Sequence, residues 1–124
     1  MEVYKDMSLV VITPTSSETS ITQKGYRNFF RVNANDTEQA AVDAGFLVNN
    51  LKARKIVVVH NDTPYGVGLR DEMKKALAAV GGEVVLTLQV KEGQPRYLDE
   101  VAQIKAANPD AIFYAGYELS LIHI

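Results

Sequence analysis

The sequence predicts an α/β fold built on a parallel, doubly wound sheet, and two features of the chain indicate it. First, residues 55–60, "KIVVVH", form a continuous apolar run, and residues 83–90 and 111–116 have the same character. Such runs are typical of parallel strands that are covered on both faces. Second, stretches with helical periodicity separate the runs, and strands that alternate with helices of about ten to fifteen residues indicate βαβ units.

Two shorter strands are expected before these. Residues 8–12 end in the β-branched run "VVI", and we expect them to form a short buried strand that Pro14 stops. A polar stretch follows over residues 15–26, in which Gly25 breaks any regular element. Residues 29–32, "FFRV", are the next predicted strand.

Three helices are expected between and after the strands. The first begins at Asp36, which together with Gln39 fits a loose capping-box pattern. The second follows the turn "NDTPYG" and ends at Gly81. The third covers about residues 96–107. Their inner faces are expected to hold Ala40, Ala44, Leu47, Val48 and Leu51, then Leu69, Met73, Leu77 and Val80, and finally Leu98, Val101 and Ile104.

Composition narrows the class of protein. The 124 residues suffice for one modest domain, and the net charge of −2 without a basic cluster argues against a nucleic-acid partner. Cysteine is absent, so neither a disulfide framework nor thiol chemistry is expected. No apolar run approaches the roughly 20 residues of a membrane-spanning helix, and the first residues lack the apolar core of a secretory signal.

Polar and aromatic side chains gather where the predicted strands end. Ligands of open parallel sheets bind beyond the carboxyl ends of the strands. The first such end carries Ser16 and Ser17, whose hydroxyl and backbone N–H groups suit a carboxylate. The alternative is that these serines are ordinary turn and cap residues.

Two tyrosines complete the set of candidate ligand contacts. Tyr65 stands in a strand-to-helix turn, where its ring is able to cover an apolar ligand and its hydroxyl to bind a polar group, or where it is simply a surface residue fixed by the turn. Tyr117 follows the last strand, whereas Tyr114 is expected in the core. His60 is interpreted as structural, because no cysteine supports a metal site and no elbow motif around Ser16 supports a Ser–His pair.

The order of these features resembles a known family. "VVITPTSSETSITQKGYRNFFRVNANDTEQAAVDAGFLVN", followed by "KIVVVHNDTPYGVGL", resembles the type I periplasmic solute-binding proteins, and within them the leucine/isoleucine/valine-binding proteins of ABC importers. The likeness runs from about Val3 to Glu118. It rests on a Pro and hydroxyl cluster at a strand end, an aromatic-Arg strand, Asp-x-x-Gln at a helix start and a Tyr-Gly turn.

The resemblance implies a fragment of a fold with two doubly wound lobes that close on a ligand. Residues 1–32 would end the first lobe, and residues 33–118 would form the hinge crossing and the first βαβ units of the second lobe. In amino-acid-binding relatives, the positions of Ser16 and Ser17 grip the α-amino-acid group, that of Tyr65 closes over the ligand, and the region of Tyr117 lines the cleft. The carboxylate that pairs with the ligand ammonium generally comes from a later strand.

The same resemblance implies capture without chemistry. No catalytic residue, metal or cofactor is expected; the implied partners are a small-molecule ligand such as an amino acid and the permease subunits of an ABC importer. The implied location is periplasmic, or extracytoplasmic with a lipid anchor. The alternatives are a ligand-sensing domain of a receptor or transcription regulator, and a binding protein for an amide, urea or an aromatic acid, because Thr15 and Ser16 replace smaller residues.

The last six residues fit none of these patterns. Residues 119–124, "LSLIHI", resemble the translation of a transposase adapter used in sequencing libraries, so we interpret them as an artefact and exclude His123 from any site.

Overall fold

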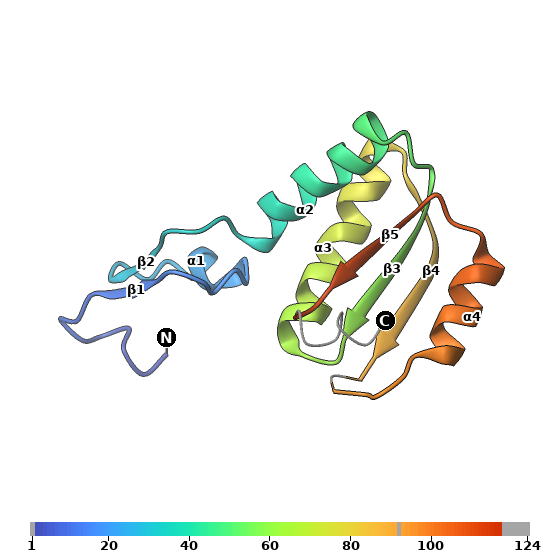
Figure 1. Ribbon diagram of the computed structural model, residues 1–124. Coiled ribbons are helices and arrows are strands. Elements are labelled where there is room, and N and C mark those ends of the chain that lie inside the picture. The colour runs from blue at the N-terminus through green and yellow to red at the C-terminus, as the bar shows by residue number, and fades with distance from the viewer. Residues whose placement is uncertain (1, 92, 118–124) are drawn as a thin grey trace.

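The computed structural model describes residues 2–91 and 93–117, and Figure 1 shows their arrangement. The tail at residues 119–124, interpreted above as an artefact, lies outside the described residues. The elements follow in the order β1 (Val11–Thr13), α1 (Ser20–Gln23), β2 (Phe29–Arg31), α2 (Asp36–Gly45), the π-helical turn η1 (Phe46–Asn50), β3 (Lys55–Asn61), α3 (Pro64–Val80), β4 (Glu83–Val90), α4 (Leu98–Ala107) and β5 (Ala111–Ala115).

The N-terminal unit is a two-stranded parallel sheet in which β1 pairs with β2, with α1 in the connection. The sequence placed the first strand at residues 8–12 and expected it to be buried; both points are wrong. The strand begins at Val11, and the Ile12 side chain is 64% exposed. Within the described residues, only the short helix α1 accompanies these two strands, which is too little to cover an apolar sheet face.

The larger unit has a three-stranded parallel sheet in the order β4-β3-β5. In Figure 1, α2 and α3 lie over one face of this sheet and α4 over the other. The connection through α3 leads to one side of β3, and the connection through α4 returns to its other side. Two crossovers of the same hand that run in opposite directions place their helices on opposite faces. The predicted doubly wound arrangement is therefore confirmed.

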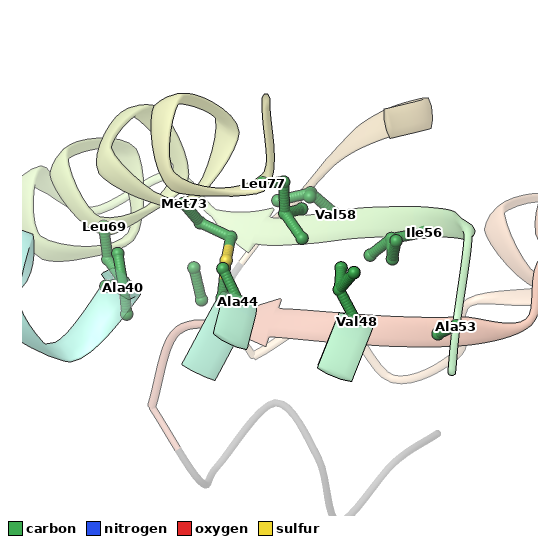
Figure 2. Close-up of a cluster of buried hydrophobic side chains, with 10 residues drawn as sticks. Ala40, Ala44, Val48, Ala53, Ile56, Val58, Leu69, Met73 and Leu77 are labelled. Atoms are coloured by element: carbon green, nitrogen blue, oxygen red, sulfur yellow. The ribbon is translucent and has the colours of Figure 1, made fainter. Parts of the chain in front are cut away.

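Strand β3 is buried on both faces, which explains its unbroken apolar sequence. Ile56 and Val58 pack toward α2 and α3 in one cluster with Met73 and Leu77. Figure 2 shows Val58 beside Leu77 and Ile56 beside Val48. Their neighbours in the chain point the other way, into a second cluster under α4. That cluster consists of Val57, Val59, Val90 and Tyr97, with Ile104 and Ala107 of α4 packed against it.

Helix α2 begins with a complete capping box, one residue earlier than the sequence predicted. Asn35, not Asp36, is the cap: the Glu38 N–H donates to Asn35 Oδ1 over 2.9 Å, and the Asn35 N–H donates to Glu38 Oε2 over 3.2 Å. Asparagine is as effective a cap as aspartate. Asp36 is thereby moved into the first turn of the helix, where a negative charge is favoured by the helix dipole.

The ends of α3 follow the sequence. The Thr63 side chain accepts from the Gly66 N–H, Pro64 occupies the first turn, and Gly81 ends the helix in the left-handed region with φ 80°.

In two other helical segments, a residue that was predicted on the buried face is exposed. Leu51, beyond η1, is 57% exposed, and Leu98 at the start of α4 is 70% exposed. Tyr97, which the sequence did not place in the core, is 3% exposed, and its hydroxyl donates to the Lys91 carbonyl over 3.1 Å. Because the loop before α4 folds back onto the sheet, the tyrosine fills the space that periodicity assigned to Leu98.

Candidate functional site

The loop after β1 is held by its own polar atoms and by Arg31. The Ser16 N–H donates to Thr13 Oγ1 over 3.0 Å, which curls the chain immediately after Pro14. The Arg31 guanidinium donates to the Ser16 carbonyl over 3.3 Å and to the Glu18 carbonyl over 2.8 Å. The Ser17 carbonyl accepts from the Asp36 N–H over 2.8 Å. These bonds fix the loop against the start of α2 and leave Ser17 largely buried.

The turn after β3 positions Tyr65 through a tight polar contact. The Thr63 hydroxyl donates to Asn61 Oδ1 over 2.6 Å, and the Gly66 N–H donates to Thr63 Oγ1 over 3.2 Å. A Cβ at Gly66 would lie 2.1 Å from Asn61 Oδ1 and 2.8 Å from the Ala115 carbonyl oxygen. Only glycine lets α3 start this close to the ends of β3 and β5, and that closeness places Tyr65 at the sheet edge.

The end of β5 brings the second tyrosine to the same edge. The rings of Tyr65 and Tyr117 stack, with centroids 5.3 Å apart and planes 27° from parallel. The Tyr114 hydroxyl donates to the Tyr117 carbonyl over 3.2 Å, which holds the segment after the strand. Tyr114 is partly buried and packs against the cluster under α4, in agreement with its predicted core position.

A cleft of about 880 Å³ opens between the loop after β1, the start of α2 and the two tyrosines. All four sequence-predicted contacts, Ser16, Ser17, Tyr65 and Tyr117, line it. Three strand ends that are far apart in the chain thus share one rim. The other lining residues are Thr15, Glu18, Ile21, Asn33, Asp36, Gln39, Pro64 and Gly116.

The charge in the cleft is negative. Among the described residues that line it, two are carboxylates, Glu18 and Asp36, and none is a lysine, arginine or histidine. Burial raises the pKa of the Tyr65 hydroxyl, and the carboxylates of Asp36 and Asp43 raise it further, whereas a hydrogen bond with Gln39 lowers it. The tyrosine is therefore a neutral hydroxyl at physiological pH, beside an acidic helix face.

The sequence missed Asp36 as a cleft residue. Its side chain is only 2% exposed, and its Oδ1 has no hydrogen-bond partner within the described part of the chain. In the sequence, Asp36 was interpreted as a helix cap, and its place in the lining of the cleft was therefore not predicted. The signal that could have identified it is a carboxylate placed between the predicted crossing segment and the predicted helix.

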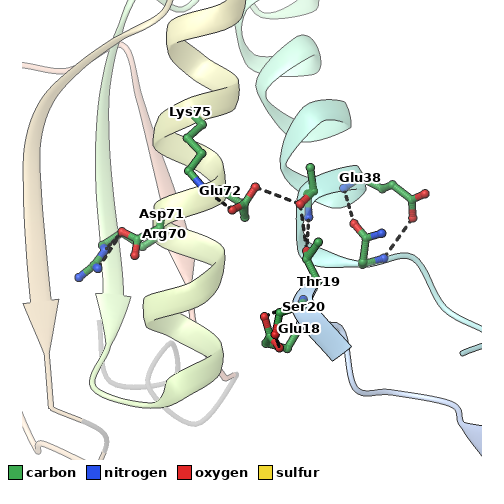
Figure 3. Close-up of polar contacts among 10 residues, drawn as sticks. Glu18, Thr19, Ser20, Glu38, Arg70, Asp71, Glu72 and Lys75 are labelled. Carbon is green, nitrogen blue, oxygen red and sulfur yellow. Dashed lines mark hydrogen bonds and ion pairs between the residues drawn. The ribbon is translucent and has the colours of Figure 1, made fainter. Parts of the chain in front are cut away.

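A chain of hydroxyl contacts ties the N-terminal unit to the helices beside the cleft (Figure 3). The Thr37 N–H donates to Thr19 Oγ1 over 3.2 Å, and the two threonine hydroxyls lie 2.9 Å apart. Thr37 Oγ1 donates to Glu72 Oε2 over 3.0 Å, so its proton is used and the Thr19 hydroxyl is the donor in the contact between them. Lys75 in turn donates to Glu72.

His60 does not line the cleft. It is buried, its Nδ1 lies 2.8 Å from the Asn61 carbonyl, and its Nε2 lies 3.3 Å from an Arg70 guanidinium nitrogen. A guanidinium only donates, so Nε2 accepts and Nδ1 carries the proton. The ring is a packed, hydrogen-bonded part of the strand end, as the sequence suggested.

The described residues contain neither a metal-binding cluster nor a membrane-spanning helix. No cluster of three His, Cys, Asp or Glu side chains suited to a metal ion occurs among them. Over the same residues, no helix combines the length and the apolar character needed to cross a membrane.

Proteins named for amino-acid binding are similar over most of the chain. The chain is 31% identical over 115 residues to an amino acid binding protein of Pseudomonas aeruginosa, and 32% identical over 115 residues to Leu/Ile/Val-binding protein homolog 1 of Brucella melitensis. Both alignments cover 93% of this chain. The chain spans about 31% of the length of these relatives.

Solved structures agree with these sequence relatives. An ABC transporter substrate-binding protein of Desulfitobacterium hafniense, solved in complex with Leu, matches with a TM-score of 0.77 and 27% identity, covering 92% of this chain and 34% of that one. A benzoate-bound solute-binding protein of R. palustris matches with a TM-score of 0.79 and 20% identity, over 91% of this chain and 31% of that one, which shows a shared fold alone. The model of the periplasmic binding protein family matches residues 1–124, and the chain therefore belongs to that family.

Proposed function

We propose that this chain is part of an extracytoplasmic solute-binding protein of an ABC importer, most suited to branched-chain or other amino acids. The observation that carries the proposal is the convergence of Ser16, Ser17, Tyr65 and Tyr117 on one cleft. Relatives named for binding Leu, Ile and Val support the ligand class, and the substrate-binding protein solved with Leu supports the transport role. The permease subunits would be the membrane partners, and the activity is capture, not catalysis.

The cleft suits an amino acid in two respects. Ser16 and Ser17 offer their hydroxyl groups to a carboxylate or ammonium end, and hydrogen bonds to charged groups are the stronger ones. The stacked rings of Tyr65 and Tyr117 offer an apolar wall. A cleft that combines a few polar groups with aromatic walls is the usual form of a small-molecule site.

We propose that residues 1–32 belong to one lobe and residues 33–118 to the crossing and the start of the other, as the sequence indicated. The cleft then lies between the lobes, and rotation about the crossing would close it over the ligand. Exposed apolar side chains on β1 and β2, such as Ile12 and Phe30, support a further layer that covers the first unit.

The first prediction concerns Ser17. In the full-length protein, Ser17→Ala is expected to weaken leucine binding by about 1–3 kcal/mol, because a buried charged group of the ligand loses a hydrogen bond. Isothermal titration calorimetry measures the change. Ser8→Ala, at an exposed serine outside the cleft, is the matched control and should leave the affinity unchanged.

A ligand panel separates the proposed function from its alternatives. Leucine, isoleucine and valine should bind more tightly than benzoate, urea or an aliphatic amide. Equal affinity of Ser17→Ala and the native protein for leucine would remove Ser17 from the site. Permease and ATPase genes next to the gene of this protein would support a role in an ABC importer. A DNA-binding or receptor segment fused to the chain would instead indicate a ligand-sensing domain.

A further inference from the structure

Arg31 contacts the loop that carries the predicted serine contacts, although it is not among the described residues that line the cleft. This loop, residues 14–19 and here called the serine loop, follows β1 and leads into α1. Arg31 is the last residue of β2, and its Cα partner in β1 is Thr13, the residue before the loop. The arginine is therefore placed to act on the serine loop from outside the cleft.

The guanidinium of Arg31 donates to three acceptors in this part of the chain. Nη1 donates to the Ser16 carbonyl over 3.3 Å and to the Glu18 carbonyl over 2.8 Å, and Nη2 donates to Thr22 Oγ1 in α1 over 2.6 Å. Hydrogen bonds from a charged donor are stronger than neutral ones. Because the planar guanidinium holds its donors in a fixed fork, one rigid group fixes both carbonyls relative to α1.

The carbonyl between these two is held as well. The Ser17 carbonyl accepts from the Asp36 N–H over 2.8 Å, so the carbonyls of three successive residues, 16–18, all accept from donors of the protein. The peptide group that joins Ser16 to Ser17 is planar and contains the carbonyl that Arg31 holds. Its orientation therefore affects the direction in which both serines present their side chains to the cleft that they line.

We infer that Arg31 is the positioning residue of the serine loop: its guanidinium holds Ser16 and Ser17 in the arrangement that meets the ligand, without touching the ligand itself. This inference rests on the proposed function and deepens it, because it names a residue outside the cleft on which affinity depends. A loop that is ordered before binding lowers the entropy cost of association. Without the bonds of Arg31, the loop would have to become ordered as the ligand binds, and the affinity would fall.

Arg31→Lys tests the geometry of the guanidinium separately from its charge. Lysine keeps a positive charge near the loop, but its ammonium is a point charge on a flexible stem and lacks the planar fork. Titration calorimetry with leucine on the full-length protein should show an affinity lowered roughly 10-fold, as expected when charged hydrogen bonds that order a loop are lost. Arg27→Lys is the matched control: Arg27 is an exposed arginine of the same unit, outside the cleft, and this change should leave the affinity unchanged.

A double-mutant cycle with Ser17→Ala distinguishes positioning from a general effect on the fold. If Arg31 acts through the serine loop, its bonds matter less once the Ser17 hydroxyl is gone, because fewer ligand contacts depend on the loop. In the Ser17→Ala background, Arg31→Lys should therefore lower the affinity by no more than about 3-fold. An arginine that only stabilises the fold would give the same factor in both backgrounds, since the effects of independent sites are additive in free energy.

Amide hydrogen exchange measures the order of the loop directly. In the ligand-free Arg31→Lys variant, the amides of residues 15–19 should exchange faster than in the native protein, while β3 exchanges at the native rate. Saturating leucine should slow the exchange of the loop again. Thermal melting followed by circular dichroism establishes that each variant is folded, and Arg31→Gln is the second variant if Arg31→Lys does not fold.

The outcomes separate this inference from the proposed function. A native protein that binds neither leucine nor another amino acid ends the proposed function and this inference with it; if another amino acid binds in place of leucine, the cycle is measured with that ligand. A native protein that binds, with an Arg31→Lys variant of native affinity or with the same loss in both backgrounds, overturns the role of Arg31 alone. That role is also overturned if Ser17→Ala binds like the native protein, or if neither Arg31 variant folds.

Discussion

At the scale of single residues, the shape of the cleft depends on a few closely packed atoms. Gly66 shows this most clearly, because a Cβ there would overlap Asn61 Oδ1 and press on the Ala115 carbonyl. The same Asn61 oxygen accepts from Thr63, which caps α3. The turn that carries Tyr65 is thus built by close contact between the strand ends at Asn61 and Ala115 and the start of α3, and one methyl group at Gly66 is enough to disturb it.

Substitution of that glycine tests the point. Gly66→Ala is expected to lower the free energy of unfolding by about 1–3 kcal/mol, as overpacking does in a tight site. Urea denaturation measures the loss. Gly45→Ala is the control with the opposite expected sign: at Gly45, at the end of α2, a Cβ would be 4.0 Å from its nearest neighbour, so alanine should stabilise the helix by about 0.5–1 kcal/mol. Equal effects of the two substitutions on the free energy of unfolding would contradict the crowding around Gly66.

At the scale of elements, the start of α2 connects the N-terminal unit to the rest. Its Asp36 N–H bonds the serine loop, and Thr37 joins Thr19 on one side and Glu72 of α3 on the other. The cap residue of this helix was predicted one position late, because Asn35 and Asp36 are both good caps and the local sequence does not choose between them. The reciprocal hydrogen bonds between Asn35 and Glu38, in the first turn of α2, make the choice.

The hydroxyl of Thr37 gives a prediction at this scale. Thr37→Val is expected to cost about 0.5–1.5 kcal/mol, the net value of a hydrogen bond, and to loosen the N-terminal unit in particular. Amide hydrogen exchange should accelerate over residues 11–31 while the exchange of β3 stays unchanged. Thr37→Ser, which restores the hydroxyl, should recover the native exchange. Uniform acceleration throughout the chain would mean that the contact does not link the two units.

At the scale of the whole molecule, a carboxylate ties together the starts of two neighbouring strands. Asp110, just before β5, accepts from the Lys55 N–H over 2.8 Å and from the Arg54 N–H over 2.7 Å at the start of β3. These bonds, that of Lys55 first, hold the pKa of the Asp110 carboxyl below its ordinary value of 3.8. The carboxylate therefore stabilises the fold above pH 3.8, and its contribution is lost as the pH falls from there through the lowered pKa.

This sign leads to a prediction about acid stability. The melting temperature of the native protein should fall as the pH drops below 3.8. Asp110→Asn should melt lower at pH 7 and should lack this part of the acid-induced loss, because an amide does not titrate. Asp99→Asn removes the same charge at an exposed position and should keep the native profile. If Asp110→Asn kept the native dependence of the melting temperature on pH, the Asp110 carboxylate would not be a cause of the acid-induced loss of stability.

What the sequence by itself determined is local. The apolar run of β3, the stripe of Leu69, Met73 and Leu77, and the stop at Gly81 were all readable, because backbone preference and periodicity act over a few neighbouring residues. The polar character of the strand ends was readable too, and a parallel sheet brings such ends to one edge. The four predicted contacts therefore line one cleft, and their role as ligand contacts stays a prediction.

Only the tertiary structure decided which surfaces are buried and which polar atoms lack partners. The apolar sequence of the first strand predicted burial, but Ile12 is exposed and its two neighbours in β1 are only half-buried, and Tyr97 took the place expected for Leu98. Asp36 looked like a helix cap and proved to be a buried carboxylate beside the serine loop, whose Oδ1 has no hydrogen-bond partner in the described part of the chain. Burial depends on what packs against a residue from elsewhere in the chain, and that information is not present in the few residues around it.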